Sequence, residues 1–151
     1  MTTPVARRAG RVLLVDAQSR LLLFRGGDPV APELGTWWFT PGGGLDDGET
    51  HAEGAARELR EETGLDLPPE SLGESVLDRD VEFSFGGRLF AQSEQFFLAR
   101  VEAHEVDTAG FSPLEMAAVV EHRWWSLTDL ATTDDMVYPV GLAELLSRLG
   151  V

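Results

Sequence analysis

The sequence predicts an α/β protein in which helices cover both faces of a β-sheet. Two continuous apolar runs, at 11–16 and 20–25, are typical of strands that are buried on both sides. A segment with helical spacing follows at 51–63, and four leucines near the end of the sequence have the i, i+3, i+4, i+7 spacing of an amphipathic helix. These are Leu142, Leu145, Leu146 and Leu149. Because apolar strands must be covered by other elements, the helices are expected to pack on the sheet.

Three strands are expected before the first helix. The two apolar runs are separated by Ala-Gln-Ser, which predicts a hairpin. The segment 26–35 is rich in glycine and proline and therefore predicts a loop. Aromatic and β-branched residues at 36–40 predict a third strand, which Pro41 and the three glycines after it should end.

The helix at 51–63 has predicted caps at both ends. Thr50 is the expected N-cap residue, and Glu53, three residues later, completes a capping box. Gly64 is expected to follow the last turn in the left-handed conformation. Two further strands, at 76–85 and 88–101, are predicted on either side of the turn Gly86-Gly87. The acidic segment 102–118 should be a long loop with some helix, and 122–127 suggests a last strand before the closing helix.

Composition excludes several kinds of chemistry. The chain of 151 residues has a net charge of −14 and no cysteine, which excludes a thiolate nucleophile and a zinc–thiolate site. Its twelve basic residues are all arginine, which excludes a P-loop lysine and Schiff-base chemistry. No basic stripe is visible, so long nucleic acid is not an expected partner. The length predicts one domain over 1–151. The apolar runs are too short for a membrane span or a signal peptide, so a cytoplasmic protein is expected.

The helix at 51–63 gathers carboxylates on one face. Glu58, Glu61 and Glu62 fall within roughly 100° of arc, and like charges at these spacings destabilise a helix by about 0.2–0.5 kcal/mol per pair. Solvated helix faces usually alternate positive and negative side chains. The run of carboxylates is therefore less well explained as an ordinary solvent-exposed face. A hard divalent cation would offset the repulsion, and 42–44 are glycines that let backbone groups approach an ion or a phosphate closely. The residues therefore predict a Mg²⁺–phosphate site.

At these positions the sequence resembles the Nudix hydrolases. Their signature, G-x5-E-x7-R-E-U-x-E-E-x-G-U with U a bulky aliphatic residue, is matched at every fixed position between 43 and 65. The matching residues are Gly43, Glu49, Arg57, Glu58, Leu59, Glu61, Glu62, Gly64 and Leu65. The resemblance implies an α/β/α sandwich with a mixed β-sheet. It also implies Mg²⁺-dependent cleavage, with Mn²⁺ as a substitute, of a nucleoside diphosphate linked to another group X.

The resemblance further implies roles for particular residues. Glu58, Glu61 and Glu62 would bind the metal together with the carbonyl of Gly42. Arg57, together with Glu49, would hold the loop and the helix in register. A water activated by the metal would attack phosphorus.

The general base is left open between candidates. Glu61 is the first, because it is a signature carboxylate beside the metal. Glu121, placed in the loop before Trp124-Trp125, is the second, and Glu94 is a weaker one. An alternative function is a catalytically silent, nucleotide-sensing domain of the same family, but such domains typically lose signature carboxylates that this sequence keeps. The nucleotide, the X group and the oligomeric state are not indicated.

Overall fold

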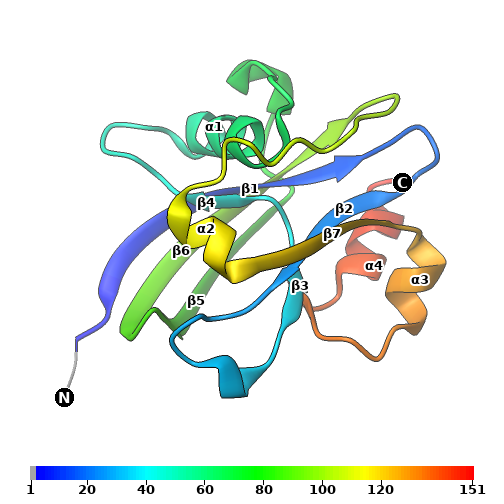
Figure 1. Cartoon of the computed structure of the whole chain (residues 1–151). Helices are drawn as coiled ribbons and strands as arrows, with labels where there is room; N and C mark the ends of the chain where they lie inside the picture. Colours follow the sequence, from blue (N-terminus) through cyan, green and yellow to red (C-terminus); the bar gives the residue numbers. More distant parts are fainter. Residues whose placement is uncertain (1–2) are drawn as a thin grey trace.

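An eight-stranded mixed β-sheet forms the centre of the protein in a computed structural model, which describes residues 3–151 (Figure 1). The strands are β1 (Val5–Val15), β2 (Leu21–Gly26), β3 (Trp37–Phe39), β4 (Gly42–Gly44), β5 (Leu77–Phe85), β6 (Arg88–Arg100), β7 (Val119–Trp125) and β8 (Val137–Tyr138). The main order is β5-β6-β1-β2-β3-β8, while β4 pairs with β1 and β7 with β2. The β1/β6 and β3/β8 pairs are parallel and the others are antiparallel, so the predicted mixed sheet is confirmed.

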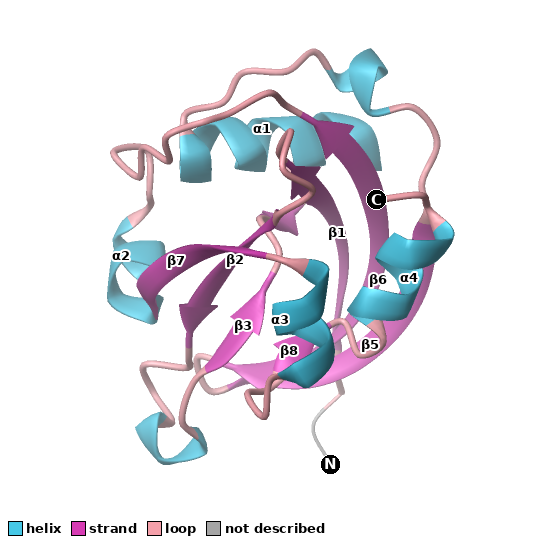
Figure 2. Cartoon of the chain, turned by 90° about the vertical axis from the view of Figure 1, so that its right-hand side faces the viewer, coloured by secondary structure: helices cyan, strands magenta, loops and turns pink. Residues whose placement is uncertain are grey.

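Helices cover the sheet on both faces (Figure 2). They are α1 (His51–Thr63), α2 (Pro113–Ala118), α3 (Leu127–Thr132) and α4 (Leu142–Arg148), with short 3₁₀ turns at Pro32–Leu34 and Pro69–Leu72. Alternate residues of β1 and β2 point to opposite faces, which creates two cores. Val12 and Leu14 pack with Ala55 and Leu59 of α1, whereas Leu13 belongs to the core that contains the leucines of α4. The predicted sandwich of helices around a sheet is confirmed.

Helix α1 has the predicted bounds and both predicted caps. The Thr50 side chain accepts the backbone N–H of Glu53, the Glu53 side chain accepts the backbone N–H of Thr50, and Gly64 follows with a φ of 77°. The helix lies directly on β1 at Gly10, where an added Cβ would lie 2.3 Å from the carbonyl oxygen of His51. This close approach fixes the height of α1 above the sheet and hence the position of its carboxylates.

Several elements differ from the prediction. The glycines after Pro41 form the short strand β4 and not a loop, because Gly42–Gly44 pair with Arg11, Gly10 and Ala9 of β1. Strand β7 begins at Val119, so Glu121 lies in a strand; its predicted place in a loop is wrong. Nor is β7 the last strand, because β8 follows the helix α3, and neither of these was predicted.

The remaining predicted elements are confirmed, although β1 begins at Val5, six residues before the predicted run at 11–16. Strands β5 and β6 form a hairpin at Gly86-Gly87, where both glycines have positive φ, and segment 102–118 is a loop that ends in the short helix α2. Strands β1 and β2 meet antiparallel through Val15 and Leu21. Within residues 3–151, no helix combines the length and apolar character that a membrane crossing requires.

Candidate functional site

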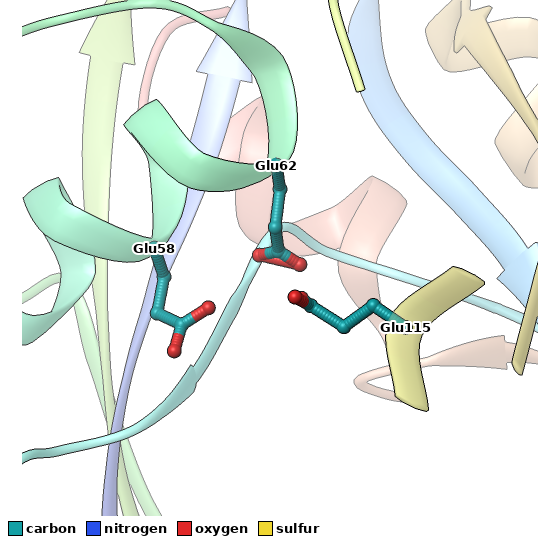
Figure 3. A group of neighbouring side chains, drawn as sticks. All are labelled: Glu58, Glu62 and Glu115. Atoms are coloured by element: carbon teal, nitrogen blue, oxygen red, sulfur yellow. The ribbon is translucent and has the colours of Figure 1, made fainter. Parts of the chain in front are cut away.

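Three carboxylates converge where the C-terminal half of α1 meets α2 (Figure 3). Glu58 and Glu62 are one turn apart on α1, and Glu115 reaches toward them from α2. One carboxylate oxygen from each residue lies within 4.8 Å of the other two. We call Glu58, Glu62 and Glu115 the acidic cluster. Three oxygen donors at this separation suit a hard divalent cation such as Mg²⁺.

Glu62 is the most buried member of the acidic cluster. Its exposed fraction is 3%, and its Oε1 accepts a 2.7 Å hydrogen bond from the backbone N–H of Gly42. Gly42 has a φ of 145°, and a Cβ there would lie 2.5 Å from the carbonyl oxygen of Gly10, so only glycine fits at this position. Strand β4 therefore brings backbone groups directly against the cluster.

The acidic cluster places like charges close together in a partly buried environment. Burial raises the pKa of Glu62 well above its ordinary value, and the neighbouring Glu58 and Glu115 raise it further. Burial likewise raises the pKa of Glu58, with Arg57 opposing the shift. A bound cation would remove the repulsion and favour the ionised carboxylates. The donor set and the charge balance both fit a divalent metal.

Arg57 joins the loop before α1 to the carboxylates on the helix. Its Nε and one terminal nitrogen donate to the two oxygens of Glu49 at 2.9 and 3.0 Å, and the same terminal nitrogen donates to the carbonyl of Gly44 at 3.1 Å. The other terminal nitrogen donates to Glu58 and Glu61, each at 3.1 Å. This pairing lowers the pKa of Glu49 and raises that of Arg57. One side chain thus positions three carboxylates.

The structure separates the predicted site residues into two groups. Glu58, Glu62 and the backbone of Gly42 come together, whereas Glu61 lies outside the acidic cluster with one oxygen on Arg57. Glu121 is not part of the cluster either: it is exposed on β7, and its Oε1 accepts a 2.9 Å hydrogen bond from Nε of Arg25.

Glu94 lies in the middle of β6. It is 3% exposed, and its Oε2 accepts a 3.2 Å hydrogen bond from Nε of Arg79. Nε of Arg11 lies 3.5 Å from the same oxygen. A carboxylate that is paired in this way is poorly available as a base.

Glu115 is the site residue that the sequence interpretation missed. A signal existed, because Ser112-Pro113-Leu114-Glu115 is a capping box of the same kind as the one at Thr50. Ser112 accepts the backbone N–H of Glu115, and Oε1 of Glu115 accepts the backbone N–H of Ser112 at 2.9 Å. The capping box fixes the side chain of Glu115. The segment between β6 and β7, which contains α2, brings this side chain to Glu58 and Glu62.

Two cavities of the protein lie away from the acidic cluster, and the second is lined in part by Arg7. Their volumes are about 620 and 790 Å³, they share Arg8, and they lie beside the N-terminal end of α1 and the loop before it. Among the described residues, none of the acidic cluster lines either cavity. The carboxylate chemistry and not cavity size therefore identifies the site.

A mixed sheet between helices, with three converging carboxylates beside a strand of glycines, defines an α/β protein whose site suits a divalent metal. The sequence profile of the NUDIX domain family matches residues 5–145. The chain is 31% identical over 137 residues to an RNA pyrophosphohydrolase of Erythrobacter litoralis, covering 78% of this chain and 74% of that protein. An RNA pyrophosphohydrolase of Novosphingobium aromaticivorans is 29% identical over 136 residues, covering 85% and 80%.

Solved structures show the same fold. The MutT protein of Methanosarcina mazei Go1 superposes with a TM-score of 0.72 at 19% identity, covering 99% of this chain and 96% of that one. The chain belongs to the Nudix family of hydrolases, which act on phosphoric anhydride bonds, as its signature residues predicted.

Proposed function

We propose that the protein hydrolyses a nucleoside diphosphate linked to a further group X, in a reaction that depends on Mg²⁺ and accepts Mn²⁺. The observation that carries this proposal is the acidic cluster, in which Glu62 is 3% exposed and lies among like charges. The names of the Erythrobacter and Novosphingobium relatives support cleavage between phosphates. The substrate is a small nucleotide derivative or a 5′-phosphorylated end, because the chain as a whole repels polyanions at a net charge of −14.

Each residue of the site has a role in this proposal. A bound divalent cation would neutralise the diphosphate and lower the pKa of a water that attacks phosphorus. Glu58, Glu62 and Glu115 would hold that cation, with the carbonyl of Gly42 as a further oxygen donor. The N–H of Gly42 keeps Glu62 in position by its 2.7 Å hydrogen bond.

The proton from the attacking water goes to a carboxylate. We assign this role to Glu61, whose side chain is 36% exposed and therefore accessible to water. Arg57 binds one oxygen of Glu61 and leaves the other free to accept the proton. Arg57 acts as a positioning residue, because it contacts carboxylates and not the reacting atoms.

A panel of nucleotide derivatives with and without a chelator tests the proposed function. Nucleoside triphosphates, nucleotide sugars, ADP-ribose, dinucleoside polyphosphates and a short 5′-triphosphorylated RNA are incubated with Mg²⁺, and the products are separated by chromatography. We expect release of a nucleoside monophosphate or pyrophosphate, loss of turnover on chelation, and recovery with Mg²⁺ or Mn²⁺. Full turnover after chelation, or no hydrolysis of any member with metal, would contradict the proposal; binding without hydrolysis would indicate a nucleotide-sensing domain.

A matched pair of substitutions tests which carboxylate near α2 and β7 takes part. Glu115→Gln removes one charge from the acidic cluster and keeps the side-chain shape, so turnover should fall by about tenfold or more. Glu121→Gln removes one charge from an exposed pair with Arg25 and should change turnover by less than about threefold. Steady-state rates at saturating Mg²⁺ decide between them. The reverse pattern would return the role to Glu121.

A further inference from the structure

The face of the sheet opposite α1 carries an unusual charge for so acidic a chain. Side chains alternate along β1, and because Gly10 faces α1, Arg7 and Arg11 point to the other face. The register places Arg7 beside Gln92 of β6, and Arg79 of β5 opposite Glu94. By the same alternation, Glu94 is the one carboxylate that β1, β5 and β6 contribute to this face. In a protein with a net charge of −14, the arginines outnumber the carboxylate here.

Two of these arginines are fixed by the protein itself. Nε of Arg79 donates to Glu94 at 3.2 Å, and Nε of Arg11 lies 3.5 Å from the same oxygen. A terminal nitrogen of Arg11 also donates to the carbonyl of Thr40 at 3.1 Å. Glu94 is therefore shared between two guanidinium groups, and a third arginine on this face has to share the same single carboxylate.

Of Arg7, Arg11 and Arg79, it is Arg7 that has no acceptor of its own in the described part of the chain. Among residues 3–151, no hydrogen bond or ion pair holds its guanidinium, although the side chain is only partly exposed. The group lies flat against β4, since a Cβ at Gly44 would be 2.5 Å from Nε of Arg7, and its Cζ lies 5.3 Å from the centre of the Phe90 ring. Burial, followed by the repulsion of Arg11, lowers the pKa of Arg7. Packing thus holds the guanidinium group of Arg7 in place, and its N–H donors remain available to a ligand.

Arg7 also lies close to the acidic cluster. Its charge interacts with Glu58, and that of Arg11 interacts with Glu62. Gly43 and Gly44 separate the two features, with Gly43 against the Glu58 carboxylate and Gly44 against Arg7. Because Arg7 lies on the face of the sheet opposite α1, a ligand whose phosphates are bound at the cluster would reach Arg7 by passing around the edge of β4 that is not paired with β1.

We propose that Arg7 binds a substrate phosphate group beyond the two that occupy the metal site, so that the enzyme prefers nucleotides with three or more linked phosphates. This inference rests on the proposed function and deepens it by naming the substrate class. The planar guanidinium matches a phosphate through two parallel N–H donors. A neutral sugar as the X group would leave the charge of Arg7 unbalanced beneath the substrate, which is unfavourable.

The variant Arg7→Met tests this assignment, because methionine keeps an unbranched stem and removes the guanidinium. Arg148→Met is the matched control: it removes the same charge from an exposed position on α4. We expect Arg7→Met to lower kcat/KM for a nucleoside triphosphate by about tenfold to a hundredfold, mainly through KM. The loss for the diphosphate sugar of the same nucleoside should be less than about threefold. Arg7→Lys should recover part of the loss, since it restores charge without the planar donors.

Two further readouts separate binding from folding and from turnover. The melting temperature of Arg7→Met should be unchanged or higher, because a guanidinium without an acceptor and beside Arg11 is removed; a clear drop would assign Arg7 to the scaffold and overturn the proposal. Binding is measured by calorimetry with a nucleoside triphosphate analogue that has methylene bridges in place of both anhydride oxygens. Arg7→Met should weaken this binding at least tenfold, and Arg148→Met should not.

The outcomes distinguish the two proposals. If wild-type protein hydrolyses nucleotides with Mg²⁺ but Arg7→Met handles the triphosphate equally well, the role of Arg7 is wrong and the proposed function stands. If wild-type protein hydrolyses nothing but binds the analogue through Arg7, the proposed function is wrong and the phosphate site stands. Failure of the wild type to bind the analogue overturns the phosphate site.

Discussion

Glu62→Gln should abolish most of the activity and at the same time stabilise the metal-free protein. Glutamine keeps the shape of the side chain, and its Oε1 can still accept the N–H of Gly42. The substitution removes the one fully buried charge of the three carboxylates in the acidic cluster. Because Glu62 is a proposed metal ligand, its substitution should lower turnover by on the order of a hundredfold or more. Without metal, the same charge is buried among Glu58 and Glu115, so its removal relieves repulsion.

The expected stabilisation of Glu62→Gln depends on pH in a defined direction. Since the pKa of Glu62 is raised in the folded state, ionisation is less favourable there than in the unfolded chain. The metal-free wild type should therefore lose stability as pH rises from the ordinary range of a glutamate through the raised pKa. The variant lacks this loss, so its advantage should grow with pH and reach about 1 kcal/mol or more, roughly 2–4 °C in Tm.

Thermal melts between pH 5 and pH 8, with and without Mg²⁺, check this prediction. Added Mg²⁺ should stabilise the wild type more than the variant, because binding to the folded state alone raises its stability. The control is Glu70→Gln, because Glu70 is exposed and lies in a 3₁₀ turn away from the acidic cluster. Glu53→Gln would not serve, because Glu53 caps α1. A variant that melts well below wild type without metal and still turns over normally would show that Glu62 is part of the scaffold.

Arg57→Lys should have the opposite effect on stability and a comparable effect on activity. Lysine carries the charge but cannot donate to Glu49, Glu58, Glu61 and the carbonyl of Gly44 together. Arg57 is 18% exposed, and breaking such a network leaves several carboxylates close together without a partner. We expect a loss of about 3 kcal/mol in the free energy of unfolding. The fall in turnover should be about tenfold to a hundredfold, because the carboxylates lose their orientation.

Denaturant unfolding and steady-state kinetics on the same preparation check the effect at Arg57. Arg60→Lys is the matched control, since Arg60 is exposed on the same helix. Saturating Mg²⁺ should recover part of the stability of Arg57→Lys, since the cation replaces some of the missing positive charge. An Arg57→Lys variant with wild-type stability and activity would mean that the hydrogen bonds to Glu49 and Gly44 contribute nothing.

The sequence predicts some elements well because their signals are local. Helix α1 is bounded by Thr50 and Gly64, whose capping interactions involve residues within one turn, and the hairpin at Gly86-Gly87 is equally local. By contrast, β4 consists of three glycines that have no strand propensity and form a strand only because β1 pairs with them. The two-residue strand β8 depends in the same way on its pairing with Trp38 and Phe39 of β3.

The residues of the candidate site show the same difference between local signals and long-range contacts. Glu58, Glu62 and Arg57 were predicted because they share one helix and one signature. Glu115 was not predicted, because its place beside Glu62 depends on the path of the whole loop between β6 and β7. The surroundings of Arg7 could not be predicted from the sequence either, because they depend on the register of β1 against β4 and β6.

The central claim is that Glu58, Glu62 and Glu115 bind a divalent cation. Crystals of the protein grown or soaked with Mn²⁺ test it most directly, because the anomalous scattering of manganese locates the ion without reference to any substrate. We expect an anomalous peak between the three carboxylates, within about 2.0–2.3 Å of their oxygens. A Mn²⁺ peak at another acidic group, with none in the acidic cluster at saturating Mn²⁺, would contradict it.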